Sequence, residues 1–433
     1  MPTPAPSARP YLRVAVIFAL ATAVVAWVSG WLRFPALPAE VKPSTAMDFS
    51  ASQVARNARY RAELGQWPLI ELFAPAAVAV LIAITGLRSR IVRRVRRVTW
   101  LSVSGHAGLV VAAMVTLMRL AALPAAWAGE VVARRWSLST QSTPSWLREQ
   151  LLGLLTAAFI AFVVAGVATA AVRRWPRTWA LRLSWLAAAA VLLLTLFPIM
   201  RALPPEKTAP LPNSAVATAM RDMTTKAGLA GTHLRVLNVS EDSAEINAYA
   251  SGSGPMAQVV VYDTLLKGVP TPQVLSVLAH ELGHVRYRDS LVLSVATAAC
   301  VGSGVLGLGL FWRRRKLAAT RLPFALTEIP GVCAAVAVVM LLLLPASNAV
   351  SRAVEARADI YSLETTNDPV AFVRVMRTIA VHGHSYLGDQ TPWGWARSHP
   401  TIAWRLALAR AWAKERGIVV PATSPDYTAQ RPR

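Results

Sequence analysis

Apolar residues gather in seven long runs along this chain. A helical crossing of a bilayer takes about 20 residues, and the pattern predicts spans at 12–32, 68–86, 101–123, 150–172, 180–199, 290–311 and 329–347. The first run ends in Trp31, Leu32 and Arg33 instead of the small residues of a cleavage site, so we interpret it as a retained span and not a signal peptide. The pattern therefore predicts a mostly α, polytopic membrane protein with about seven transmembrane helices.

Two stretches outside the runs are polar enough to form a separate domain. Segment 200–289 opens with a proline-rich linker and predicts a helix at 215–227 and a strand at 233–239. A hairpin is expected from 244–250 and 258–262, because a glycine-rich turn separates two strand-like runs. We divide the chain into a five-span region (1–199), a small α+β domain with an edge-strand hairpin (200–289), the last two spans (290–347), a C-terminal helical region (348–416) and a disordered tail (417–433).

Composition supports the membrane interpretation and narrows the function classes. Hydrophobic residues make up 55% of the 433 positions, and the mean hydropathy is +0.43. The formal charge of +23 would suit a nucleic-acid partner, but the arginines cluster beside apolar runs, as membrane-flanking charges do. The two cysteines, Cys300 and Cys333, both lie in apolar runs, which excludes a disulfide framework and a cysteine-rich zinc module.

The basic residues also predict an orientation. They concentrate after the second, fourth and sixth runs, at Arg88, Arg90, Arg93, Arg94, Arg96, Arg97, Arg173, Arg174, Arg177, Arg313, Arg314, Arg315 and Lys316. Loops with this excess are cytoplasmic. With seven spans, 200–289 and the C-terminal region then lie outside, although one miscounted span would reverse this. The loop charges thus predict an extracytoplasmic catalytic side. Arginine far outnumbers lysine, which suggests a GC-rich bacterial genome, so we expect a bacterial plasma membrane.

The strongest chemical signal is the sequence His280-Glu281-Leu282-Gly283-His284. On a helix, His280 and His284 are one turn apart on the same face, so both imidazoles can reach one metal ion. Glu281 points beside the metal's open position and suits a general base. A chance occurrence of the motif, or a structural histidine pair, is the competing explanation.

A catalytic zinc site needs a third protein ligand. Glu355 and Asp359 are also four residues apart on an expected helix. We predict that Glu355 binds the metal and that Asp359 accepts the free ring N–H of a ligating histidine. The alternative is an acidic, solvated helix face paired with Arg352 or Arg357. Two histidines and one carboxylate would hold one Zn²⁺ with an open position, where bound water becomes acidic, with a pKa near about 7.

These residues, in this order, resemble the integral-membrane type I CAAX prenyl endopeptidases, which are zinc proteases of the gluzincin type. The resemblance covers about 230–410. It rests on Asn247-Ala248-Tyr249, the run 259–266, the two zinc motifs, and Ser398-His399-Pro400 with Arg405. The family's second proline after the His-Pro pair is Thr401 here.

The resemblance implies roles for residues that carry little signal alone. Asn247, Ala248, Tyr249 and Ala250 would belong to an edge strand that pairs with an extended substrate. His399 would donate to the oxyanion, and Arg405 would flank the site. Taken alone, this strand would be an ordinary hairpin arm and His399 a loop residue. Glu71, His106 and Arg119 could line a chamber between the spans.

The leading hypothesis is thus a membrane zinc metalloendopeptidase that acts on peptide or protein substrates, in quality control or in CAAX-type processing. The alternative is a seven-span transporter or receptor with a structural zinc, but a closed structural site would have no use for Glu281. No soluble charged domain supports a nucleic-acid binder. The sequence does not indicate an oligomeric state or the natural substrate.

Overall fold

The computed structural model describes residues 8–196, 208–314, 326–383, 385, 387–388 and 394–421. Within these ranges the chain is mainly helical, and seven helical stretches are long and apolar enough to cross a membrane. They are Arg9–Val28, Ala51–Ile84, Val103–Arg135, Thr143–Arg174, Trp179–Leu196, Asp289–Trp312 and Leu326–Thr366. Each contains or overlaps one predicted span, so the seven-span fold class is confirmed.

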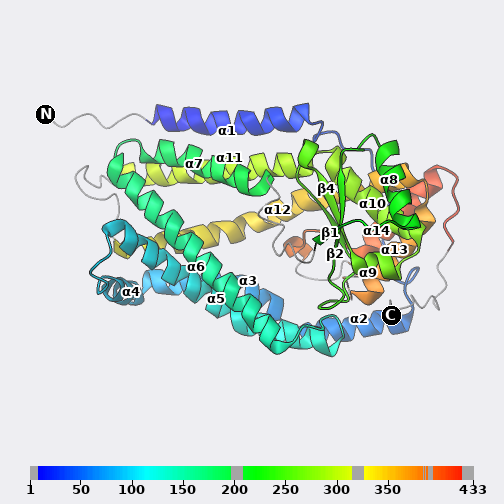
Figure 1. The fold of residues 1–433 in the computed structure, drawn as a ribbon, viewed down its shortest axis with the longest axis horizontal. Helices are drawn as coiled ribbons and strands as arrows, with labels where there is room; N and C mark the ends of the chain where they lie inside the picture. The colour runs from blue at the N-terminus through cyan, green and yellow to red at the C-terminus, as the bar shows by residue number, and fades with distance from the viewer. Residues whose placement is uncertain are drawn as a thin grey trace.

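The spans form two groups with one long helix between them (Figure 1). In the first group α1 (Arg9–Val28), α7 (Trp179–Leu196) and α11 (Asp289–Arg314) share an apolar core that includes Tyr11 and Phe18. In the second, α3 (Trp67–Ile84) packs on α5 (Val103–Arg135), which packs on α6 (Thr143–Arg174). Many large apolar side chains on these helices are exposed, as expected for surfaces that face lipid.

The long helix between the groups is α12 (Ile329–Thr366), and it carries both the seventh span and Glu355. It runs without interruption through position 347, the expected boundary between the last two spans and the C-terminal helical region. Pro345 lies inside it without ending it. A chemical group near its polar end is therefore attached rigidly to the membrane-spanning part.

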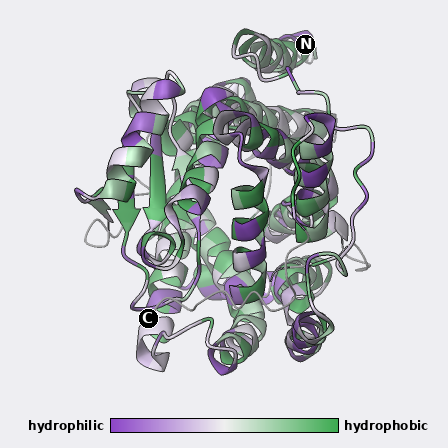
Figure 2. Ribbon diagram, turned by 90° about the vertical axis from the view of Figure 1, so that its right-hand side faces the viewer, coloured by the Kyte–Doolittle hydropathy of each residue, from purple (hydrophilic) through white to green (hydrophobic). Residues whose placement is uncertain are grey.

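A small sheet lies at one end of the molecule, with strand order β1-β2-β4-β3. The strands are β1 (Thr208–Pro210), β2 (His233–Leu237), β3 (Ala248–Ser251) and β4 (Gln258–Tyr262). β2 and β4 are parallel, whereas β3 pairs antiparallel with β4. Figure 2, which faces this end of the molecule, shows the strands as predominantly hydrophobic.

The sheet differs from the predicted hairpin in two ways. The first arm is shorter, because β3 begins at Ala248 and not at 244. The supposed linker at 208–210 forms the edge strand β1, which pairs antiparallel with β2. The remaining edge, that of β3, carries no further strand among the described residues.

Helices pack around the sheet to complete the polar domain. They are α8 (Ala215–Lys226), α9 (Asp263–Gly268), α10 (Thr271–Arg286), α13 (Pro369–His382) and α14 (Ile402–Glu415). One apolar core joins them to the sheet, and its centre is formed by fully buried side chains such as Val259, Leu278 and Leu406. Two further helices, α2 (Ala51–Leu64) and α4 (Leu87–Val95), precede and follow α3 along the chain.

Candidate metal centre

The centre is built where α10 crosses α12. Val274, Leu278 and Leu282 anchor one face of α10 in the core. Gly283 lets the two helices approach closely, because a Cβ at this position would lie 3.2 Å from the Cα of Ala358. This contact brings the His280–His284 face of α10 opposite Glu355 on α12.

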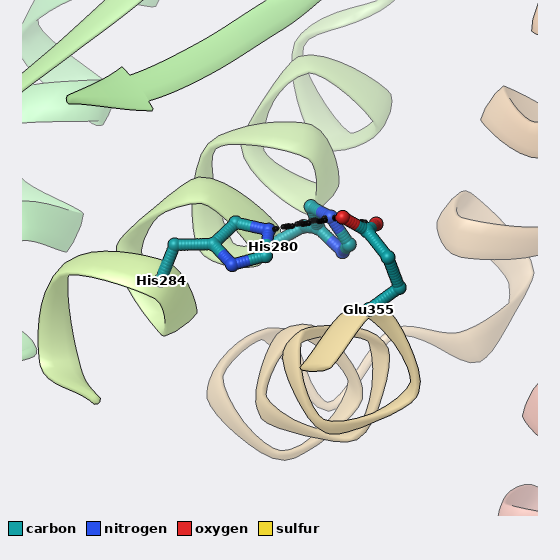
Figure 3. A group of neighbouring side chains, drawn as sticks. All are labelled: His280, His284 and Glu355. Carbon is teal, nitrogen blue, oxygen red and sulfur yellow. Dashed lines mark hydrogen bonds and ion pairs between the residues drawn. The ribbon is translucent and has the colours of Figure 1, made fainter. Parts of the chain in front are cut away.

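His280, His284 and Glu355 converge on one point (Figure 3). One ligand atom of each lies within 4.8 Å of those of the other two. The two histidine Nε2 atoms are 3.3 Å apart, and Glu355 Oε2 lies 3.3 Å from His280 Nε2. The structure therefore brings together all three residues that the sequence proposes as metal ligands.

The chemistry of this donor set fits a divalent cation. Glu355 Oε2 is buried and has no hydrogen-bond partner among the described residues, although buried carboxylate oxygens normally have one. Both histidines use Nδ1 for a carboxylate, which leaves Nε2 facing the centre. Two imidazole nitrogens and one carboxylate oxygen form the donor set of a three-ligand catalytic zinc site.

His280 is oriented by Asp359, the residue predicted to accept from a ligating histidine. Its Nδ1 lies 2.9 Å from Asp359 Oδ1. Arg405 holds the other oxygen of Asp359, with its Nε 2.8 Å from Oδ2. Arg405, expected from the resemblance to flank the site, thus binds the carboxylate that orients His280.

A second orienting pair escaped the sequence analysis. Asp289, the first residue of α11, accepts from Nδ1 of His284 at 2.8 Å through Oδ2. Its other oxygen, Oδ1, forms an ion pair with Arg357. The available signal was a lone aspartate five residues after His284, which the span pattern hides because it begins a transmembrane helix.

The surroundings of both histidines favour positive charge. Burial lowers the pKa of His280, but the neighbouring carboxylates of Asp359 and Glu355 outweigh burial and raise the pKa to about 10. Burial also lowers the pKa of His284, and its hydrogen bond to Asp289 more than compensates, so that this pKa is raised. A proton or a metal cation is therefore stabilised at this point.

A cavity of about 440 Å³ opens onto the centre. Glu281 lines it beside the two histidines, and Asn247, Ala248, Tyr249 and Ala250 line it from the β3 edge. It extends between the spans along Ser290, Ser294 and Thr297 of α11. Glu71, His106 and Arg119 are not among its lining residues within the part of the chain that the structure describes.

His399 also lines this cavity. Its Nε2 is 3.4 Å from Glu355 Oε1, and its Nδ1 is 2.9 Å from the hydroxyl of Ser398. Burial lowers the pKa of His399, and the neighbouring Arg405 and His280 lower it further against the opposing effect of Glu355. A neutral imidazole whose Nε2 faces the centre can donate a hydrogen bond there.

Comparisons with known proteins match this part of the chain. The model of peptidase family M48 matches residues 210–413. An uncharacterized metalloprotease of Bacillus subtilis, YhfN, is 28% identical over 304 residues, which are 67% of this chain and 70% of that protein. A protease HtpX homolog of Paraburkholderia phytofirmans is 30% identical over 196 residues, which are 44% of this chain and 62% of that protein.

The fold also has a solved counterpart. The crystal structure of S. mikatae Ste24p superposes with a TM-score of 0.70 and covers 92% of this chain and 98% of that one, at 15% sequence identity. At this identity the likeness concerns the fold. It includes the first five spans, which lie outside the residues that the family model matches.

Proposed function

Because this chain belongs to peptidase family M48, we propose that it is a zinc-dependent endopeptidase that cleaves peptide bonds within or beside the membrane. Family membership makes it a membrane metalloprotease, and confirms the resemblance drawn from the motifs. The proposal adds the metal, the residue roles and the substrate. The observation that carries it is the convergence of His280, His284 and Glu355, with Glu281 in the same cavity.

The proposed chemistry assigns one task to each residue at the centre. Zinc, held by His280, His284 and Glu355, supplies a Lewis acid that polarises the scissile carbonyl and makes water acidic enough to attack. Glu281 takes the proton of the attacking water and passes it to the leaving amine. His399 donates from Nε2 to the oxyanion that forms on the carbonyl oxygen.

The substrate would lie extended along β3. Tyr262 donates its N–H to Asn247, and the β3–β4 register then places Tyr249 in the same class of hydrogen-bonded pair. Ala248 and Ala250 alternate with these residues, so their N–H and C=O groups point to the free edge. The side chain of Asn247 accepts from the N–H of Ala248, which leaves the amide of Ala250 for the substrate.

The class of substrate follows from where the cavity leads. Its walls combine the β3 edge with hydroxyl-bearing positions on α11 between the spans. Peptides and loops of membrane proteins fit such a site, as in quality-control proteolysis, and so does a lipid-modified C-terminus of the CAAX type. These comparisons and the site favour an enzyme over the transporter or receptor alternative.

The proposal is tested with Glu281→Gln. An amide cannot take the proton of water, so cleavage of a quenched-fluorescence peptide should fall about a hundred- to ten-thousandfold while zinc stays bound. Glu364→Gln, an exposed position further along α12, is the matched control and should retain activity. Comparable turnover by wild type and Glu281→Gln would contradict the general-base role. If Glu281→Gln is inactive, membrane proteomics of cells that carry this variant would identify the substrates that accumulate uncleaved.

A further inference from the structure

A fully buried arginine contacts one of the carboxylates that orient the histidines of the metal centre. Arg357, two residues after Glu355 on α12, is 1% exposed. Its guanidinium forms an ion pair with Asp289 and donates to the backbone carbonyl of Trp31. The rings of Tyr287, Phe34 and Trp31 surround it, with centroids 4.2, 4.8 and 5.4 Å from its central carbon.

This arrangement comes from three distant parts of the sequence. Trp31 and Phe34 belong to the segment that follows the first span. Tyr287 lies just after α10, Asp289 begins α11, and Arg357 lies on α12. A buried guanidinium is costly unless it is paired and hydrogen-bonded. Asp289 supplies the charge, the Trp31 carbonyl supplies an acceptor and the rings supply cation–π contacts. The surroundings therefore fix Arg357 in place.

Asp289 connects this cluster to the metal centre. One of its oxygens binds Arg357, and the other lies 2.8 Å from His284 Nδ1. A carboxylate held in this way fixes the ring orientation and keeps the Nδ1 proton, so that Nε2 carries the lone pair for a metal. The pair Arg357–Asp289 thus does for His284 what Arg405–Asp359 does for His280.

The two pairs differ in their attachment. Arg405 comes from α14, within the polar domain. Arg357 is held by the residues that leave the first membrane span, and the same linker continues to Asp48, which Arg410 of α14 binds through both carboxylate oxygens. The linker is also held at its backbone, where Ala39 donates to Glu415 and the carbonyl of Asp48 accepts from Arg377. Among these contacts only the one at Arg357 touches a partner of a ligand histidine.

We propose that Arg357, held by the segment Trp31–Phe34, is a positioning residue that orients His284 through Asp289 and so couples the exit of the first span to metal affinity. The inference rests on the metal site of the proposed function. It predicts that changes at the end of the first span, far from the metal in sequence, alter how tightly zinc is held. The effect should appear in metal binding itself and not only in turnover.

The test measures zinc affinity of the purified full-length protein by competition with a chromophoric chelator. Loss of such an outer partner typically weakens metal binding about 10- to 100-fold, and we expect this for Arg357→Gln. Arg357→Lys keeps the charge but makes fewer bonds, so it should restore part of the affinity. The visible absorption of the Co²⁺-substituted protein should shift in Arg357→Gln, because it reports the geometry of the ligands.

Controls separate positioning from folding. Arg410→Gln breaks a comparable arginine–aspartate pair that touches neither histidine, and it should lower the melting temperature without changing zinc affinity. In case Arg357→Gln does not fold, Phe34→Leu removes one ring contact and should weaken zinc binding about threefold. The double variant Arg357→Gln/Asp289→Asn should bind zinc no more weakly than the weaker single variant.

The outcomes distinguish this inference from the proposed function. Wild-type zinc affinity and an unchanged Co²⁺ spectrum in folded Arg357→Gln, or in Phe34→Leu if only that variant folds, would overturn the coupling and leave the protease intact. A wild-type protein that binds no zinc would overturn both.

Discussion

Spacing along the sequence determines the relative positions of some of the proposed ligands but not of all of them. His280 and His284 are one helical turn apart, and any helix through them sets their relation. Glu355 reaches the same point only because α12 crosses α10 at Gly283. Its role as third ligand is therefore the assignment that most needs a direct measurement.

We expect Glu355→Ala to bind zinc far more weakly than the wild type, which should hold one ion per chain. Removal of the carboxylate leaves two neutral donors and no charge to compensate the cation. Elemental analysis of purified wild type, Glu355→Ala and the control Glu364→Ala gives the stoichiometry. Full retention of zinc in Glu355→Ala would assign the third position to another acid or histidine.

His399→Ala and Asn247→Ala should both retain zinc but should change different kinetic constants. His399→Ala removes an oxyanion donor, a loss of about 2.7–4 kcal/mol in the transition state, so kcat should fall about 10²–10³-fold. Asn247→Ala disturbs the end of β3, where its side chain bonds Glu245 and the amide of Ala248. Because such a change affects substrate and transition state alike, KM should rise while kcat changes little. Wild-type constants in both variants would place the two residues outside the reaction.

Residue patterns predicted much of the site, and what they missed has a physical reason. The motif spacing gave the two histidines and Glu281, and helical spacing suggested Asp359 behind Glu355. Asp289 and Arg357 were not recognised, because their pairing depends on where α11 begins relative to α12. His399 and Arg405 came only from the resemblance, since nothing in their local sequence sets their distance from the centre.

Among the elements, β3 is the one whose proposed role in substrate binding depends on a free strand edge. An edge strand leaves every second residue with free N–H and C=O groups, and such an edge can bind an extended peptide. The strand-like runs at 233–239 and 258–262 predicted β2 and β4 closely. They missed β1, because a three-residue strand ending in proline is too short to form such a run.

We expect Ala250→Pro to fold normally and to bind substrate poorly. The N–H of Ala250 points away from β4, and proline is tolerated at such edge positions. Tyr249→Pro is the contrast, because its N–H belongs to the ladder with β4 and its loss should lower the melting temperature. A quenched-fluorescence assay should show KM raised several-fold in Ala250→Pro, about as for the loss of one hydrogen bond of 0.5–1.5 kcal/mol. An unchanged KM would show that substrates do not pair with this edge.

For the whole molecule, the remaining question is which side of the membrane the metal faces. The structure gives the arrangement on which this depends. Val92 and Val95 of α4 pack against Leu326 and Ile329, just before and at the start of α12. This contact joins the second loop to the sixth. The third loop lies instead with the polar domain, where Thr140 donates to the carbonyl of Asp242. The arginine-rich α4 and the sheet are thus at opposite ends (Figure 1).

Charge then sets the expected orientation. The arginines of α4 lie close to span ends in a short loop, which is where the positive-inside rule applies. We therefore propose that Arg94 faces the cytoplasm and Asn213 the outer side, together with Ser424, which lies outside the described residues. Single cysteines at these positions, in a Cys300→Ala/Cys333→Ala background, can be labelled on intact cells with a membrane-impermeant thiol reagent. Labelling at 213 and 424 but not at 94 is expected. The reverse pattern would place the metal on the cytoplasmic side, where a CAAX-type substrate becomes the better candidate, because such C-termini are modified in the cytoplasm.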